Sequence, residues 1–219
     1  MKIIFKLLLV VFFLANANIH ARETGDNPYR KTEIRAGAVF FSLDDLNSVL
    51  KQQGQATTNI VGWSMYLGET FEAKRLTLAG GLTGLLSKNN ENKNTTSLSA
   101  VGPSLEIGYR VCGSKQAGLY PYAGLSYMFA ALHTQQQSEG GTLASVYEQS
   151  LIERSFNRQE FDLQFGLSGR FRTGKETAVG IRCGYRLCVA GGKWKYSKEN
   201  INFPSTNLRG WNLELFFNF

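Results

Sequence analysis

The chain has 219 residues, with 24 Lys and Arg, 17 Asp and Glu, and a formal net charge of +7. The positive charges are spread along the chain without a Lys/Arg run, so the composition does not indicate a nucleic-acid-binding protein. Three cysteines and two histidines, without a CxxC motif, do not indicate a metal site, and no cofactor motif is identified. The length suits a single domain.

The N-terminus has the pattern of a secretory signal. Lys2 and Lys6 precede the apolar run 7–15, and a small-x-small motif ends at Ala17. This run is about half as long as the roughly 20 apolar residues of a membrane-spanning helix, so we expect a signal peptide rather than an anchor. Cleavage is expected after Ala21, with Ala17 as the alternative, which leaves 22 basic and 17 acidic residues and a net charge of +5.

About eight stretches of the remaining chain alternate apolar and polar residues, which is the period of a β-strand with two different faces. In residues 96–111, for example, Leu105 and Ile107 alternate with Glu106 and Gly108. The predicted strands are 32–42, 58–69, 75–86, 96–111, 119–132, 156–171, 177–189 and 208–219.

The connections between the predicted strands are alternately long and short. The long, polar ones are 43–57, 88–95, 133–153 and 190–207. The first contains Leu46, Val49 and Leu50 at helical spacing, followed by Gly54, which predicts one or two helical turns. Short turns at one end and long loops at the other are the layout of a transmembrane β-barrel.

The last predicted strand has the most regular apolar face. Its apolar row ends at the terminal residue, and only Phe216 breaks the alternation. The row consists of Trp211, Leu213, Leu215, Phe217 and Phe219. This pattern resembles the closing strand of bacterial outer-membrane β-barrel proteins, and the resemblance implies that the row is also an assembly signal, read by the barrel-assembly machinery.

By its architecture the whole mature chain is similar to the transmembrane domain of OmpA, to OmpX-like proteins and to small porin-family barrels. The fold class we expect is all-β: a closed antiparallel up-and-down transmembrane barrel. The expected domains are a signal peptide at 1–21, a short N-terminal segment at 22–31 and the barrel at 32–219. The resemblance implies a monomer in the outer membrane of a Gram-negative cell envelope, with both termini periplasmic.

The polar faces of the predicted strands carry charges of both signs among Gly and Ser, whereas the apolar faces are almost free of charge. An eight-stranded barrel is only wide enough to be filled by side chains, so we predict a paired charge network inside it. Its members are Arg35, Glu106, Arg110, Glu160, Asp162, Arg170, Arg182, Arg186 and Glu214. The alternative is a soluble lipocalin-like barrel, in which these charges would face water.

Three functions remain open at this point. A filled barrel with long loops favours a structural or surface-contact role, and the alternatives are a narrow diffusion channel and a lipid-modifying enzyme. For the last of these, His133 is not beside a nucleophile, and Glu160 and Asp162 have Arg neighbours on the same face. No catalytic residue is therefore assigned.

We expect contact with partners to occur through the loops. The loop at 190–207 combines aromatic and basic residues suited to anionic lipopolysaccharide, a surface protein or a glycan. These candidates are Lys193, Trp194, Lys195, Tyr196 and Lys198. Aromatic residues at a barrel rim also serve as membrane anchors, which is the alternative role for this loop.

Overall fold

The computed structural model describes residues 29–91, 94–114, 116–136, 152–174, 177–196, 199–200 and 208–219. The predicted signal peptide lies outside these residues. The long strands are β1 (Tyr29–Phe41), β2 (Val61–Ala73), β3 (Leu76–Glu91), β4 (Asn94–Tyr109), β6 (Ala117–Gln136), β7 (Ile152–Arg172), β8 (Ala178–Gly191) and β11 (Gly210–Asn218). The short elements are β5 (Cys112–Gly113), β9 (Lys195–Tyr196), β10 (Glu199–Asn200) and the helix α2 (Asp44–Gln52).

The eight long strands form a closed antiparallel barrel, which confirms the predicted fold class. Each long strand pairs with the next one along the chain, including β6 with β7. The ring closes because β11 pairs with β1, with Phe217 opposite Ile34 and Trp211 opposite Phe40. No helix within the described ranges is long and apolar enough to cross a membrane.

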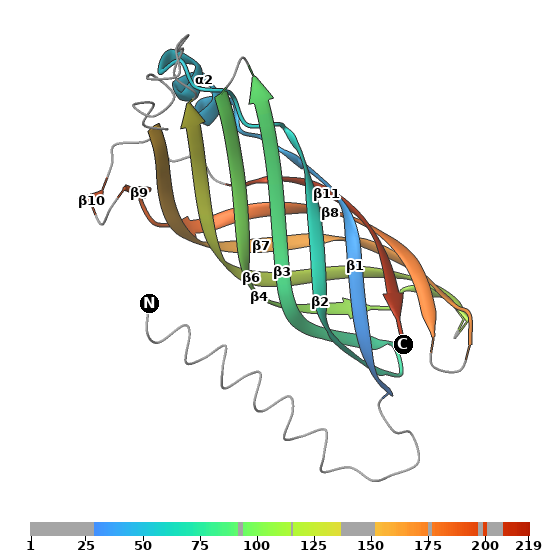
Figure 1. Cartoon of the computed structure of the whole chain (residues 1–219). Helices are drawn as coiled ribbons and strands as arrows, with labels where there is room; N and C mark the ends of the chain where they lie inside the picture. The colour runs from blue at the N-terminus through green and yellow to red at the C-terminus, as the bar shows by residue number, and fades with distance from the viewer. Residues whose placement is uncertain are drawn as a thin grey trace.

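The two ends of the barrel differ (Figure 1). The first residues of β1, the C-terminus and the short turns after β2, β4 and β7 lie at one end, here called the terminal end. The tips of β3, β4, β6 and β7 lie together with α2 at the opposite end, here called the loop end.

Several strands are longer than predicted. The β3–β4 pairing continues to Glu91 opposite Asn94, so the expected loop at 88–95 is wrong. His133, expected at the start of a loop, pairs with Ser155 inside the β6–β7 ladder. The N-terminal segment was predicted to extend to residue 31, but β1 already begins at Tyr29. The polar residues of these segments therefore belong to strands that continue in a polar environment, and not to loops.

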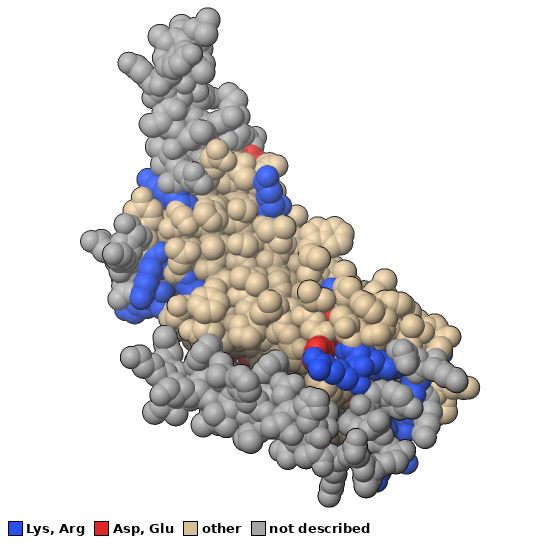
Figure 2. Space-filling model, turned by 60° about the horizontal axis from the view of Figure 1, so that its bottom comes forward, with Lys and Arg blue, Asp and Glu red and all other residues tan. Residues whose placement is uncertain are grey.

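The outer surface carries an apolar band. On six strands the outward-pointing residues are uncharged and mostly apolar over a stretch that matches the about 9–11 residues needed for a tilted strand to cross a bilayer. These stretches are Leu76 to Leu86, Val101 to Tyr109, Leu119 to Phe129, Phe161 to Phe171, Val179 to Val189 and Trp211 to Phe219. Figure 2 shows a broad face of this kind, with Lys and Arg gathered at its margins.

Beyond this band, β3, β4, β6 and β7 continue toward the loop end and the polarity of their two faces is exchanged. One row of paired residues points outward and is polar: Lys88, Ser97, His133 and Ser155. The adjacent row points inward and is buried: Ser87, Leu98, Leu132 and Phe156. These strand extensions therefore have the pattern of a water-soluble protein, with an apolar inside and a polar outside. We call them the loop-end wall.

The inner side of the loop-end wall packs against α2 in an apolar core. The buried members of this core are Val39, Phe41, Leu43, Leu46, Leu50, Leu85, Leu98, Ala100, Met128, Ala130, Leu132, Phe156, Trp194 and Leu208. Leu46 and Leu50 lie one helical turn apart, so α2 presents both to the core. The predicted helical turns in this connection are thus present as a cover over the barrel interior.

Side-chain hydrogen bonds hold the segment after α2 against the β3–β4 hairpin. The Thr96 hydroxyl donates to the Ala56 carbonyl at 2.6 Å, and the Asn89 amide donates to the Thr57 carbonyl at 2.9 Å. The hydroxyl of Ser87 donates to the Asn59 carbonyl at 2.7 Å. The three carbonyls belong to the segment between α2 and β2, where no helix or strand supplies a backbone partner. The bonds therefore hold this segment against the loop-end wall.

Candidate functional site: the filled lumen and its cover

The centre of the lumen is occupied by a network of ion pairs around Arg35. This guanidinium binds Glu33 and donates to the Glu106 carboxylate at 2.8 Å, and Arg182 approaches Glu106 from the other side at 2.9 Å. Arg35 lies over the ring of Tyr66, at 3.8 Å from its centroid. Planar guanidinium groups suit this combination of paired oxygens and a stacked aromatic ring.

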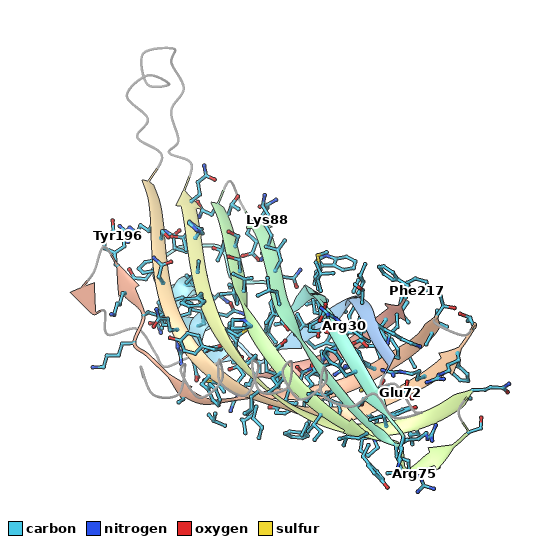
Figure 3. The ribbon with its side chains drawn as sticks, turned by 90° about the horizontal axis from the view of Figure 1, so that it is seen from below. Arg30, Glu72, Arg75, Lys88, Tyr196 and Phe217 are labelled. Carbon is cyan, nitrogen blue, oxygen red and sulfur yellow. The ribbon has the colours of Figure 1, made fainter. Side chains whose placement is uncertain are left out.

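The network continues to the terminal end through Glu72. Its carboxylate accepts from Arg172 at 2.7 Å and from Arg170 at 3.4 Å. Figure 3 labels Glu72 together with Arg30 and Arg75 toward this end of the molecule, far from Lys88 near the tip of β3. Glu214 joins through Arg182, at 3.9 Å from its Nε. In this part of the lumen, ion pairs join four acids and four arginines: Glu33, Glu72, Glu106, Glu214, Arg35, Arg170, Arg172 and Arg182. Lys31, which is 4% exposed, adds a further positive charge near Glu72.

A second, smaller group lies nearer the loop end. Arg186 binds the Asp162 carboxylate at 3.2 Å, and Arg158 lies 3.7 Å from the Glu160 carboxylate. The Cys188 side chain points into the same group from β8. The Arg158 guanidinium lies 6.0 Å from the ring centroid of the buried Trp194.

The structure places all the predicted network residues except Arg110 inside the barrel in buried positions. The structure corrects the assignment of Arg110 to the network, because β4 ends at Tyr109 and Arg110 belongs to the following turn. Its guanidinium donates to the carbonyls of Ser114 at 3.1 Å and Lys74 at 3.4 Å. It therefore fastens two turns of the terminal end instead of joining the ion pairs.

The prediction omitted five of the charged lumen members that the structure describes: Lys31, Glu33, Glu72, Arg158 and Arg172. Glu33 and Arg158 share the inward side of their strands with Arg35 and Glu160, a signal that the alternation carried. Glu72 and Arg172 were missed because the predicted strands ended too early, at 69 and 171, and Lys31 was missed because the first predicted strand began too late, at 32. Strand parity thus identifies the lumen charges, provided that the strand ends are known.

Phe216, the residue that breaks the alternation of the last strand, points into the lumen and is 4% exposed. It lies opposite Gly180 in the β8–β11 ladder, and its ring occupies the space that a side chain at Gly180 would need. Arg170 lies 5.4 Å from the ring centroid. An aromatic ring at this position fills the lumen beside the glycine and gives the guanidinium an apolar surface to stack on.

The apolar row of β11 is exposed on the outer surface, at Trp211, Leu213, Leu215, Phe217 and Phe219. The row has strands on both sides, with Leu215 opposite Ala36 of β1 and Ile181 of β8. This placement makes it part of the apolar band. Its role as an assembly signal stays a prediction.

The predicted contact residues of the last loop divide into two groups. Lys193, Lys195 and Tyr196 are exposed, and Lys198 lies outside the described residues. Trp194 as a surface contact is wrong, because its side chain is 1% exposed and belongs to the apolar core. The indole is drawn inward because the cover over the lumen is apolar, which the sequence of one loop cannot reveal.

The candidate catalytic groups do not meet. His133 lies on the outward side of β6, whereas Glu160 and Asp162 point into the lumen from β7. All three cysteines are free, with Cys112 and Cys183 exposed and Cys188 buried.

A scan of protein-family models and a search of curated protein sequences each found no match. Among solved structures, the chain is similar to a major outer membrane protein of Thermus thermophilus, at 13% identity and a TM-score of 0.52, over 87% of this chain and 98% of that one. It is also similar to Neisserial surface protein A, at 13% identity and a TM-score of 0.44, over 87% and 95% of the two chains.

A further similar structure is Ail, the attachment invasion locus protein of Yersinia pestis, at 12% identity and a TM-score of 0.47, over 88% of this chain and 99% of that one. Ail has also been solved in complex with the heparin analogue sucrose octasulfate. At these identities the similarity shows the fold alone, which is the eight-stranded barrel of outer-membrane proteins.

Proposed function

We propose that this protein resides in the outer membrane with its loop end outside the cell, and that it acts by surface contact instead of transport or catalysis. The observation that carries the proposal is the loop-end wall. β6 and β7 are 20 and 21 residues long, about twice the roughly 9–11 residues needed to cross the bilayer. The extra residues build a polar, rigid surface beyond the apolar band.

The orientation follows from the same asymmetry. In outer-membrane barrels the short turns face the periplasm and the longer connections face outward. The turns after β2, β4 and β7 are short and lie at the terminal end, whereas α2 and the wall lie at the loop end. Both termini are accordingly assigned to the periplasmic side.

The partner chemistry that this surface fits best is anionic lipid A phosphate in lipopolysaccharide. Lys193 and Lys195 are exposed beside Tyr196, and Lys88 is exposed on the wall. Amphipathic tyrosine at a membrane rim and lysine facing anionic headgroups are both favourable. A protein or glycan at the cell surface with similar negative charge is the alternative partner.

The test of the proposal is lipopolysaccharide binding by the folded protein in detergent. Replacing Lys193 and Lys195 together with Gln is expected to weaken binding roughly tenfold or more at low salt, because each exposed charge contributes about 1 kcal/mol near an anionic surface. The matched control replaces Lys74 and Arg75, which are exposed at the terminal end, and should leave binding unchanged. Equal losses in both variants, or no loss in the first, would contradict the proposed contact surface.

The channel alternative predicts a lumen through which ions pass. The lumen described above is filled by paired charges at its centre and by an apolar core at its loop end. We therefore expect the refolded protein to show no steady, discrete conductance in a planar lipid bilayer. Reproducible single-channel steps, abolished by an antibody or ligand at one end, would favour the channel instead.

A further inference from the structure

One group of side chains in the lumen has the composition of a metal site. Glu160, Asp162 and Cys188 each offer a ligand atom, and these three atoms lie within 4.8 Å of one another. It is the only such group among the residues that the structure describes. All three residues are buried, so the group is part of the interior and not a solvated acidic patch.

The fold builds this group from two neighbouring strands at an irregularity. Asp162 pairs with Cys188, but the next pair is Phe161 with Ala190, which leaves Val189 as an extra residue in β8. A β-bulge of this kind bends the strand and re-aims its side chains. Glu160 and Asp162 then point inward from alternate positions of β7 toward the Cys188 sulfur.

The two carboxylates of this group are buried and have oxygens without hydrogen bonds. Glu160 is 1% exposed and Asp162 is 0% exposed. Both oxygens of Glu160 and the Oδ1 of Asp162 have no hydrogen bond of ordinary geometry with any described residue. The Leu208 amide approaches Glu160, and the Cys188 thiol approaches both Glu160 and Asp162, but these contacts do not have the geometry of hydrogen bonds. Buried carboxylate oxygens are costly unless they are bonded or coordinate a cation.

The two nearby arginines leave one oxygen of each carboxylate without an ion pair. Arg186 takes the other oxygen of Asp162, at 3.2 Å from Oδ2, and Arg158 lies 3.7 Å from Oε2 of Glu160. Each arginine balances the charge of one carboxylate. A bound divalent cation would therefore be offset only by the Cys188 thiolate, and the group would carry a net charge of +1. Carboxylate, carboxylate and thiolate is a donor set that Zn²⁺ accepts and that Mg²⁺ and Ca²⁺ do not favour.

We propose that Glu160, Asp162 and Cys188 bind one divalent transition-metal ion of the Zn²⁺ type inside the barrel. Binding releases the thiol proton to solvent and forms the metal–sulfur bond. The metal fastens β7 to β8 under the apolar cover formed by Trp194 and Leu208. Its role is structural, because Glu160, Asp162 and Cys188 are all buried.

The test is to refold the full mature chain in detergent with Co²⁺, which reports on a sulfur ligand through its thiolate-to-metal charge-transfer absorption in the near ultraviolet. One cobalt per chain and a charge-transfer band are expected. Zn²⁺ added in competition should remove the band. Cys188→Ser should abolish the band, whereas Cys112→Ser and Cys183→Ser should retain it, because these two cysteines lie on the exposed surface.

Two further variants test whether the carboxylates also bind the metal, or whether the Cys188 sulfur binds cobalt alone. Glu160→Gln and Asp162→Asn should each weaken cobalt binding by at least the roughly 10–100-fold known for partners outside the ligand shell. Folding of each variant is checked by heat-modifiable mobility in gel electrophoresis. Absence of the band in the folded wild-type protein, or a band that persists in the folded Cys188→Ser variant, would overturn the proposal.

Discussion

Replacing Leu167 with Arg is expected to lower the free energy of unfolding by about 2–4 kcal/mol, the cost of an arginine near the bilayer midplane on the lipid face of a barrel. Leu167 is 50% exposed and lies near the middle of the outward apolar stretch of β7, from Phe161 to Phe171. The measurement is reversible unfolding by denaturant in phospholipid vesicles.

The matched control is Asn157→Arg, which has the same strand, the same outward side and the same new residue. Asn157 lies beyond the apolar band on the loop-end wall, where its exposed side chain is placed in water. Its replacement should change stability by less than about 0.5 kcal/mol, as for an ordinary surface site. A control that costs as much as Leu167→Arg would mean that the wall is immersed in lipid.

Replacing Arg35 with Met is expected to cost about 3–5 kcal/mol, because removing one partner of a buried ion pair leaves the other charge uncompensated. Arg35 is 2% exposed and binds both Glu33 and Glu106. Its loss removes one of the four arginines that pair with the four acids in this part of the lumen. The same vesicle unfolding assay measures the effect.

The double variant Arg35→Met with Glu106→Gln tests whether charge balance is the cause. Removing one acid restores equal numbers of acids and arginines, and we expect a favourable coupling of about 0.5–3 kcal/mol between the two changes. Strictly additive losses would indicate that Arg35 acts by filling space between Tyr66 and its neighbours, and not by pairing charge.

The eight strands and the side to which each residue points could be predicted from the sequence, because a period of two is a local property. Glu106, Arg182 and Glu214 were placed inside on this basis, and Phe216 inside against the pattern. The partner of each charge could not be predicted. Arg182 binds Glu106 across the lumen, and that choice depends on the register of strands far apart in the chain.

The strand ends and the cover could not be predicted for a different physical reason. Polar residues such as Lys88 and Asn90 are typical of loops, but in the loop-end wall their exposed side chains lie on the outer side of a continuing strand. Pro103 lies within β4 opposite Leu82, although proline in a central strand cannot donate a ladder hydrogen bond. The β4–β6 ladder accommodates this proline because residues 102 and 103 are not paired with β6, while the pairs on either side keep the same register.

The burial of Trp194 also could not be predicted from the local sequence. Its neighbours Lys193 and Lys195 are exposed, so the local pattern favours an exposed indole. The structure buries it because α2, far earlier in the chain, and the inner rows of β6 and β7 form an apolar core that the indole completes. Burial of this kind is decided by tertiary contacts, which override local composition.

We infer that one side of β7 passes from water on the loop-end wall to lipid in the apolar band. The most direct measurement places a spin label, one at a time, at the outward positions from Ser155 to Phe171 in a cysteine-free background reconstituted in vesicles. We expect oxygen to reach the labels from Phe161 to Phe171 better than a water-soluble nickel complex does, and the reverse at Ser155, Asn157 and Gln159. Oxygen preference that continues to Ser155, or nickel preference at Phe165 and Leu167, would contradict the account.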